Sequence, residues 1–131
     1  MIGYLDGKIL ENQEDRILLA IGDPDLGRVG YLVSVPKRGE YLQLTSSMRV
    51  SFYIYSHIRE DAFDLYGFLT IHEKEMFQCL ISVNGVGPKM ALSILSNADP
   101  GRIHTAVATQ NASLLKGIPG VGSKTVDRLL M

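Results

Sequence analysis

A short glycine-rich pattern occurs twice in this chain and constrains its fold more than any other feature. Val83–Lys89 reads VNGVGPK and Ile118–Lys124 reads IPGVGSK, an offset of 35 residues (118 − 83 = 35). Glycine allows a tight turn and a close approach of the backbone to a ligand. A helix that follows such a turn directs free N–H groups and the positive end of its dipole toward the same place. We interpret the pattern as two anion sites in tandem, which fits a repeating anion such as a nucleic-acid backbone.

Basic side chains lie just inside the helix expected after each turn. Lys89 and Lys124 hold the same place in the two copies, and Arg128 lies one helical turn after Lys124. These charges can contact phosphates, whereas no side chain here is placed to read base edges, so we expect binding directed by DNA shape rather than sequence. Val86 and Val121 are expected to occupy the hairpin tips and pack back on the helices.

Composition and charge narrow the class of protein. Of 131 residues, 46% are hydrophobic and 21% are charged, which is typical of a globular protein. Neither a membrane span nor a signal peptide is visible, and the single cysteine, Cys79, suits a reducing compartment, so we expect a cytoplasmic protein. Residues 1–65 carry 7 Lys and Arg against 10 Asp and Glu, net −3, whereas residues 66–131 carry 6 against 4, net +2. Phosphate contacts are therefore expected from the second half.

The first half of the chain has the pattern of short strands separated by turns. Runs rich in Val, Ile, Leu and Tyr predict strands over Ile2–Leu10, Arg16–Ile21, Val29–Val35, Tyr41–Leu44, Val50–Ile58 and Ala62–Phe68. Gly3 and Gly7 predict a bend or bulge in the first of them. Short antiparallel strands in this number fit a small closed barrel of the OB type, with a small sandwich as the alternative.

The second half is helical in pattern. Thr70 and Glu73 form a capping box that predicts a helix from about Ile71. Pro88 suits a first helical turn, Asp99 precedes another proline, and Asn111 is expected to cap a short helix. The second glycine turn opens the last helix. We therefore predict an α+β protein, with a barrel over residues 1–68 and two helix-hairpin-helix motifs, joined by a connecting helix, over residues 69–131.

Two other kinds of site are not favoured. Gly117–Thr125 approximates a phosphate-binding P-loop, but Ser123 separates the required glycine and lysine, and no buried strand precedes the segment. The three histidines and Cys79 show no metal-ligand spacing. We expect no cofactor, no metal and no catalytic residue.

These motifs, in this order, resemble the RuvA family of bacterial Holliday-junction-binding proteins over the whole chain. The resemblance rests on the start of the barrel at Met1, the turn Arg59–Ala62, the strand Leu65–Phe68 and the two hairpins. It implies a homotetramer, or an octamer of two tetramers, that holds a four-way DNA junction open for recombination and DNA repair. It also implies a non-catalytic subunit that serves RuvB, a hexameric ATPase that drives branch migration, with the RuvC resolvase as a further partner.

The resemblance assigns roles to particular residues. The acidic pin of the family, a turn near the fourfold axis at the junction centre, matches Glu60 and Asp61; from the residues alone they would be an ordinary solvated turn. The positions that contact the DNA backbone match Gly85, Val86, Gly87, Lys89, Gly120, Val121, Gly122, Ser123, Lys124 and Arg128.

Three features depart from the pattern of the family. Ser123 stands where many members have a second lysine. The turn Gly22–Arg28 is longer and more acidic than is usual and has no assigned role. The third, RuvB-binding domain of the family does not follow within the chain, which ends at Met131; we expect the chain to be part of a longer protein.

Two alternative functions remain at this point. The second hairpin also resembles that of base-excision DNA glycosylases, in which Lys124 would be the nucleophile. A single-strand-binding OB module would need exposed aromatic residues on its barrel, for which the candidates are Tyr31, Tyr41, Phe52, Tyr53 and Tyr55.

Overall fold

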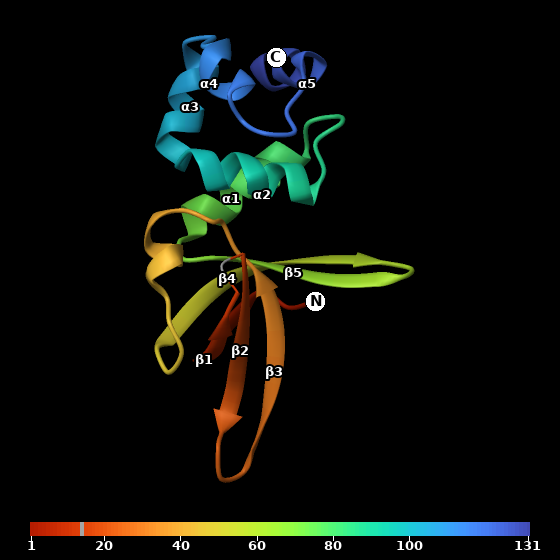
Figure 1. The fold of residues 1–131 in the computed structure, drawn as a ribbon. Helices are drawn as coiled ribbons and strands as arrows, with labels where there is room; N and C mark the ends of the chain where they lie inside the picture. Colours follow the sequence, from red (N-terminus) through yellow and green to blue (C-terminus); the bar gives the residue numbers. More distant parts are fainter. Residues whose placement is uncertain (14) are drawn as a thin grey trace. The chain divides into compact units, whose positions relative to one another are not determined.

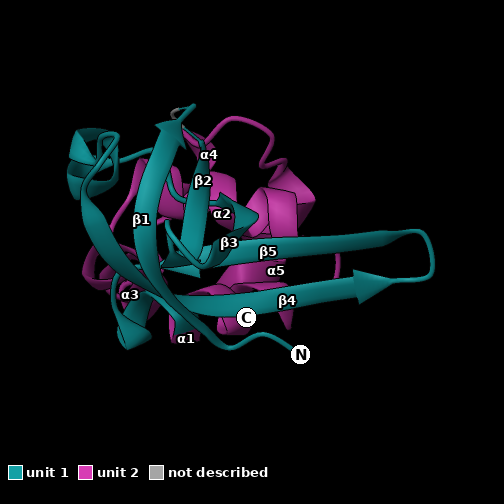
Figure 2. Cartoon of the chain, turned by 90° about the horizontal axis from the view of Figure 1, so that it is seen from below, with its two compact units in different colours: residues 1–74 teal, residues 75–131 magenta. Residues whose placement is uncertain are grey.

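The structure, a computed structural model, describes residues 1–13 and 15–131 and divides into two units. Residues 1–74 form unit 1 and residues 75–131 form unit 2 (Figure 2). The boundary falls within helix α1 (Ile71–Ile81), so that the first turn of this helix belongs to unit 1 and the rest to unit 2.

Five strands of unit 1 close into a barrel (Figure 1). They are β1 (Tyr4–Asn12), β2 (Arg16–Asp23), β3 (Gly27–Ser34), β4 (Arg49–Arg59) and β5 (Ala62–Phe68), in the order β1-β2-β3-β5-β4 around the barrel. Neighbouring strands are antiparallel except β3 and β5, which pair in parallel. The closed barrel confirms the predicted fold and excludes the sandwich.

Every second side chain along a strand points into the barrel, and these side chains fill its interior. In β4, Val50, Phe52 and Ile54 are buried, and the residues between them are partly exposed, as expected when successive side chains point to opposite faces. Ser56 continues the buried row, and its hydroxyl accepts a hydrogen bond from Ile2 N (3.0 Å) and donates one to Ile2 O (2.7 Å). This buried polar group is therefore satisfied, and it holds the start of the chain against β4.

The irregularity in β1 does not lie where the sequence predicts it. Pairing with β4 is regular through Gly7, which lies opposite Val50, whereas the register with β2 shifts between Ile9 and Glu11. Gly7 is needed for a different reason: a Cβ at this position would collide with the carbonyl oxygen of Ala20. The glycine allows close approach of two strands rather than a bulge.

The strand predicted over Tyr41–Leu44 is wrong. Residues Gly39–Gln43 form a 3-10 helix, η1. Tyr41 in this helix and Leu44, its C-cap residue, are both buried, and the N–H of Leu44 bonds the carbonyl oxygen of Tyr41 three residues earlier. A run of apolar residues this short fits either a strand or a helical turn, so periodicity could not distinguish the two.

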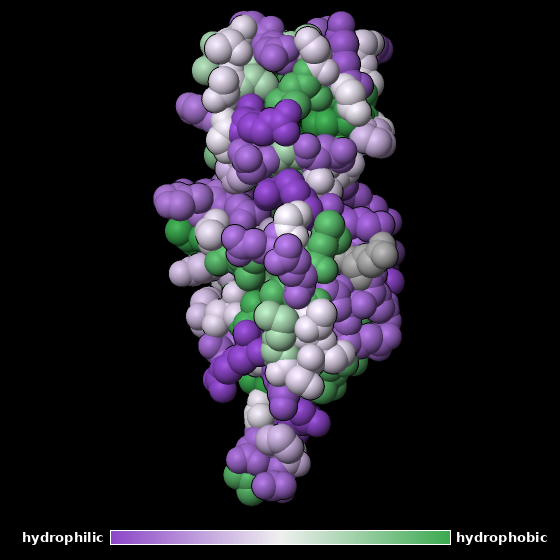
Figure 3. Space-filling model, turned by 60° about the vertical axis from the view of Figure 1, so that its left-hand side comes forward, coloured by the Kyte–Doolittle hydropathy of each residue, from purple (hydrophilic) through white to green (hydrophobic). Residues whose placement is uncertain are grey.

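Two hairpins of unit 1 extend beyond the closed part of the barrel (Figures 1 and 2). The pairing of β3 with β5 is limited to Val33 with Leu65 and Ser34 with Tyr66, so the outer parts of the β2–β3 and β4–β5 hairpins diverge. The end of the β2–β3 hairpin, the projection at the bottom of Figure 3, shows mainly hydrophilic residues, although Leu26 there is 87% exposed.

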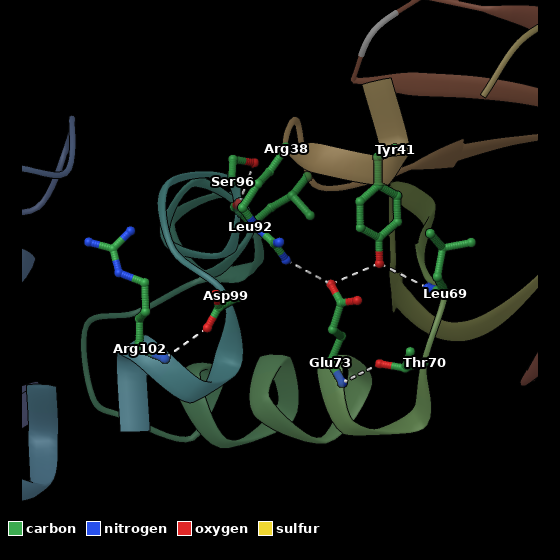
Figure 4. Close-up of polar contacts among 9 residues, drawn as sticks. All are labelled: Arg38, Tyr41, Leu69, Thr70, Glu73, Leu92, Ser96, Asp99 and Arg102. Atoms are coloured by element: carbon green, nitrogen blue, oxygen red, sulfur yellow. Dashed lines mark hydrogen bonds and ion pairs between the residues drawn. The ribbon is translucent and has the colours of Figure 1, made fainter. Parts of the chain in front are cut away.

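A polar network within unit 1 holds the first turn of α1 against η1 (Figure 4). The buried Tyr41 hydroxyl donates to Glu73 Oε2 (2.8 Å) and accepts from Leu69 N (2.9 Å). Arg38 Nη2 also donates to Glu73 Oε2, at 3.1 Å. Thr70 Oγ1 accepts from Glu73 N at 3.2 Å, which confirms the helix start, but the Glu73 carboxylate binds this network and not the backbone of Thr70.

Unit 2 contains the rest of α1 and four further helices. They are α2 (Pro88–Asn97), α3 (Pro100–Ala108), α4 (Ala112–Lys116) and α5 (Ser123–Leu130). Two predicted caps are confirmed, because Asp99 Oδ1 accepts from Arg102 N (2.8 Å) and Asn111 Oδ1 accepts from Ser113 N (3.1 Å). Helices α1 and α2 flank the first glycine turn, α4 and α5 flank the second, and α3 connects the two motifs as predicted. Among the described residues, no helix has the length and hydrophobicity needed to span a membrane.

Candidate nucleic-acid interface

The two glycine turns have the same backbone geometry. Gly85 and Gly120, the first glycines of the two copies, have φ of +89° and +86°, in the left-handed region that favours glycine. Gly87 and Gly122, the second glycines, are the N-caps of α2 and α5, with φ/ψ of −93°/177° and −86°/172°. The repeated sequence therefore folds into a repeated structure, in which each helix begins at an exposed glycine.

Hydrogen bonds close both turns in the same way. Val86 N donates to Val83 O at 3.0 Å, and Val121 N donates to Ile118 O at 3.2 Å. The valine of the first turn is buried (5% exposed), as predicted, whereas Val121 is only half-buried. Because its first turn has N–H groups with no helical acceptor, the start of each helix can bind an anion.

Reciprocal contacts brace the two motifs of unit 2 against each other. Arg128 Nη1 in α5 donates to Asn84 O in the first turn (3.3 Å), and Ser93 Oγ in α2 donates to Pro119 O in the second (3.3 Å). The repeat offset relates the partners, since 84 + 35 = 119 and 93 + 35 = 128. The second helix of each motif thus contacts the turn of the other, which is the pattern that a local twofold axis between the motifs produces.

The structure places the candidate cations on the surface of unit 2. Lys89 and Lys124 are exposed in the first turns of α2 and α5, and Ser123 is exposed beside Lys124. Arg128 is also exposed, but it reaches toward the first turn, where a Cβ on Gly85 would collide with its guanidinium. The sequence alone did not predict this contact. The 35-residue repeat makes Arg128 equivalent to Ser93, and this equivalence could have indicated that both side chains make similar contacts.

The predicted acidic pin is the end of the β4–β5 hairpin. Arg59 pairs with Ala62, which leaves Glu60 and Asp61 as a two-residue connection. Both carboxylates are exposed on a hairpin that projects from the barrel (Figure 1). Arg59 forms an ion pair with Asp64, Nη2 to Oδ2 at 3.7 Å, and within the described residues neither Glu60 nor Asp61 has an ion-pair partner. The turn therefore concentrates negative charge at the hairpin end.

The surface considered for single-strand binding finds little support in the geometry of the barrel. Of the five aromatic residues considered for single-strand binding, Tyr41 and Phe52 are buried and cannot stack on bases. No group of three or more potential metal ligands occurs in residues 1–13 and 15–131.

An OB-type barrel with an acidic hairpin, joined to a tandem helix-hairpin-helix unit, defines a class of DNA-binding protein. Comparison with known protein families agrees with this class. The family described as RuvA N terminal domain matches residues 1–67, and the family described as SAM-like Helix-hairpin-helix tandem matches residues 77–131. The chain belongs to the RuvA family.

Curated relatives match along the whole chain. Proteins of Syntrophobacter fumaroxidans and Geobacter metallireducens are 44% and 43% identical to it over 131 residues, and one of Bdellovibrio bacteriovorus is 43% identical over 133. Each is named Holliday junction branch migration complex subunit RuvA. All of this chain is covered, but it spans only 63–65% of the length of these relatives.

Proposed function

We propose that this chain binds four-way DNA junctions through the two hairpins of unit 2. The observation that carries the proposal is the pair of glycine turns with matching dihedral angles, each opening a helix with an exposed lysine, Lys89 or Lys124. The names of the relatives supply the kind of DNA, since each is called a Holliday junction branch migration complex subunit.

The local twofold relation between the motifs suits double-stranded DNA. The two strands of a duplex run antiparallel, so their phosphates are also related by twofold axes, and one turn can bind each strand. Backbone N–H groups at Gly87 and Gly122 approach a phosphate closely, and the lysines add charge. Such contacts position the protein on DNA without reading its sequence.

The acidic turn has a repulsive role in this proposal. In a tetramer with fourfold symmetry, four copies of Glu60 and Asp61 surround the axis at the centre of the junction. Carboxylates repel phosphates more strongly where the surroundings exclude water, so the turns oppose a continuous duplex across the centre and favour parted strands. Selectivity for junctions then arises partly from exclusion of the wrong ligand.

The chain acts as a non-catalytic subunit in this scheme. RuvB supplies ATP-driven branch migration and RuvC resolves the junction, and we place the RuvB contact in the part of the longer relatives that this chain does not span. The candidate residues bind, orient and exclude DNA; none of them is assigned a chemical step.

A binding experiment with a matched control tests the proposal. The chain is titrated with four-way junction, duplex and single-stranded DNA of equal length, and we expect the junction to bind most tightly. Lys124→Ala should weaken junction and duplex binding alike and lower the salt slope by about 1 per subunit for each phosphate that the side chain neutralises. Lys116→Ala, an exposed lysine of α4 outside both hairpins, makes the same change in charge and should have little effect. Equal salt slopes for the two variants would rule out a phosphate contact at Lys124.

A further inference from the structure

A small pocket on the outside of the barrel collects basic side chains from three different strands. Its volume is about 220 Å³, and its lining includes Lys8 of β1, Arg28 of β3 and Arg49 of β4. We infer that this pocket binds a phosphate group. We further infer that the group is a phosphate of the DNA backbone, and this second inference rests on the DNA-binding function proposed above.

Strand register explains why these residues meet. Lys8 lies opposite Arg49 on β4 and opposite Ala20 on β2, while Gly22, two residues beyond Ala20, lies opposite Arg28. Lys8 is exposed because its neighbours in β1 point into the barrel. Arg49 and Lys8 therefore lie in one row with Ala20, and Arg28 lies two residues further along the β2–β3 pair, opposite Gly22. Only the small residues Ala20 and Gly22 of β2 lie between the three cations.

The small residues provide the space for the pocket. Gly22 has φ of +121°, and a Cβ there would lie 2.6 Å from Gly27 O and 3.5 Å from Arg28 Cγ. Only glycine fits this place, and its lack of a side chain lets the Arg28 stem lie against β2, where Arg28 lines the pocket. The sequence alone assigned no role to the turn that begins at Gly22. In the structure this turn holds an arginine in the lining of a pocket.

An acidic neighbour orients one of the cations. Asp6 Oδ1 accepts from Arg49 Nε (2.8 Å) and lies 2.7 Å from Arg49 Nη2, while Asp6 Oδ2 accepts from Ser51 Oγ (2.6 Å). The hydrogen bond from Ser51, followed by that from Arg49, lowers the pKa of Asp6, so the carboxyl stays ionised. The pair fixes the guanidinium at the edge of the pocket and leaves its other N–H groups available.

Positive charge predominates in the lining of the pocket. Three cations against the single carboxylate of Asp6 give the lining a net charge of +2. Across the described residues, neither Lys8 nor Arg28 forms an ion pair. Asp23, in the same hairpin, directs one carboxylate oxygen to the N–H of Asp25 (2.8 Å) and is not part of the lining.

The chemistry and the size of the pocket select the ligand. A phosphate offers several acceptor oxygens and suits both the planar fork of arginine and the point charge of lysine. Drug-sized ligands occupy roughly 300–1,000 Å³, so this smaller pocket suits a single phosphate group rather than a whole nucleotide. The source is a DNA phosphodiester or a small phosphate compound, and the experiment separates them.

The first arm of the experiment uses inorganic phosphate alone. Amide NMR signals of Gly7 and Gly22, in the pocket lining, are followed during a phosphate titration, with chloride at equal ionic strength as reference. We expect saturable shifts that weaken about tenfold or more in Lys8→Gln and Arg28→Gln. Arg16→Gln, an exposed arginine of the same β2–β3 hairpin outside the lining, should behave as the parent chain. Absence of saturable shifts in the parent chain would overturn the inference.

The second arm uses duplex DNA at several salt concentrations. If the ligand is a backbone phosphate, Arg28→Gln lowers the salt slope by about 1 per subunit relative to Arg16→Gln. Saturable phosphate binding with unchanged DNA slopes would reject DNA as the source and leave a small phosphate compound. If the parent chain fails to bind DNA at all, the proposed function fails, while the phosphate titration still decides whether the pocket binds phosphate.

Discussion

Replacing Tyr41 by phenylalanine tests the polar network that holds the first turn of α1. The hydroxyl is the shared partner of Glu73 Oε2 at 2.8 Å and Leu69 N at 2.9 Å, and Tyr41 is 2% exposed (Figure 4). Phenylalanine fills the same space but leaves a backbone donor without its acceptor and a carboxylate without one donor. A buried polar group left unsatisfied costs about 1–3 kcal/mol. Because Leu69 is only half-buried and Arg38 still bonds Glu73, we expect a loss of about 2 kcal/mol.

Urea unfolding at neutral pH, followed by circular dichroism, measures this loss. With a denaturant slope of about 1–3 kcal/mol/M, the midpoint should fall by roughly 1 M. Tyr31→Phe is the matched control, because Tyr31 is half-buried and its hydroxyl makes no hydrogen bond within the described residues; it should change stability by less than about 0.5 kcal/mol. If the two variants unfold at the same urea concentration, the network does not stabilise unit 1.

The same variant has a signature in alkaline solution. Burial is the main cause that raises the pKa of Tyr41 above its ordinary value of 10.0; the Glu73 carboxylate adds to the shift and the Leu69 N–H opposes it. The unfolded chain would release this proton above about pH 10, whereas the folded chain retains it. The contribution of the Tyr41 hydroxyl to the free energy of unfolding is therefore fully present below about pH 10. Above that pH it falls by about 1.4 kcal/mol per pH unit. Tyr41→Phe should lose stability less steeply than the parent chain above pH 10.

Three further predictions address other elements. Glu60→Gln combined with Asp61→Asn should raise duplex affinity while junction binding holds, and an unchanged junction-to-duplex ratio in titrations at one salt concentration would refute the pin. Gly120→Ala should cost about 1–2 kcal/mol for its positive φ, and Gly85→Ala should cost more, because it also displaces the neighbouring guanidinium; equal unfolding midpoints would contradict this. Asp99→Ala should lower stability by about 1 kcal/mol through loss of a helix cap, as measured by thermal unfolding, and a loss below about 0.3 kcal/mol would contradict the cap.

The sequence by itself determined the features whose cause is local. Gly85 and Gly120 turn the chain because only glycine adopts positive φ freely, and the residues that follow each turn carry the local signals of a helix start. Asp99 and Asn111 cap helices through backbone groups two or three residues away. Alternation in β4 likewise needs no distant partner to be recognised. The fold class and the two hairpins were therefore predictable.

Predictions from the sequence were wrong where the structure of a short segment depends on contacts with residues distant in the chain. The apolar residues within Tyr41–Leu44 suggested a strand, but the buried Tyr41 hydroxyl is held by residues 28 and 32 positions away in the sequence. The irregularity of β1 was assigned to glycine, yet Gly7 is required by the approach of Ala20 in the next strand. In both cases tertiary packing overrode the local pattern.

Only the tertiary structure could bring together the phosphate pocket. Lys8, Arg28 and Arg49 are far apart in a half of the chain whose net charge is −3, so the sequence predicted phosphate contacts elsewhere. Strand register places Lys8 beside Arg49, and Arg28 two residues away along the neighbouring strand pair. A local field depends on the distances between charges rather than on their sum. Register is set by many strand contacts acting together, which is why a pattern read along the chain located the hairpins but not this pocket.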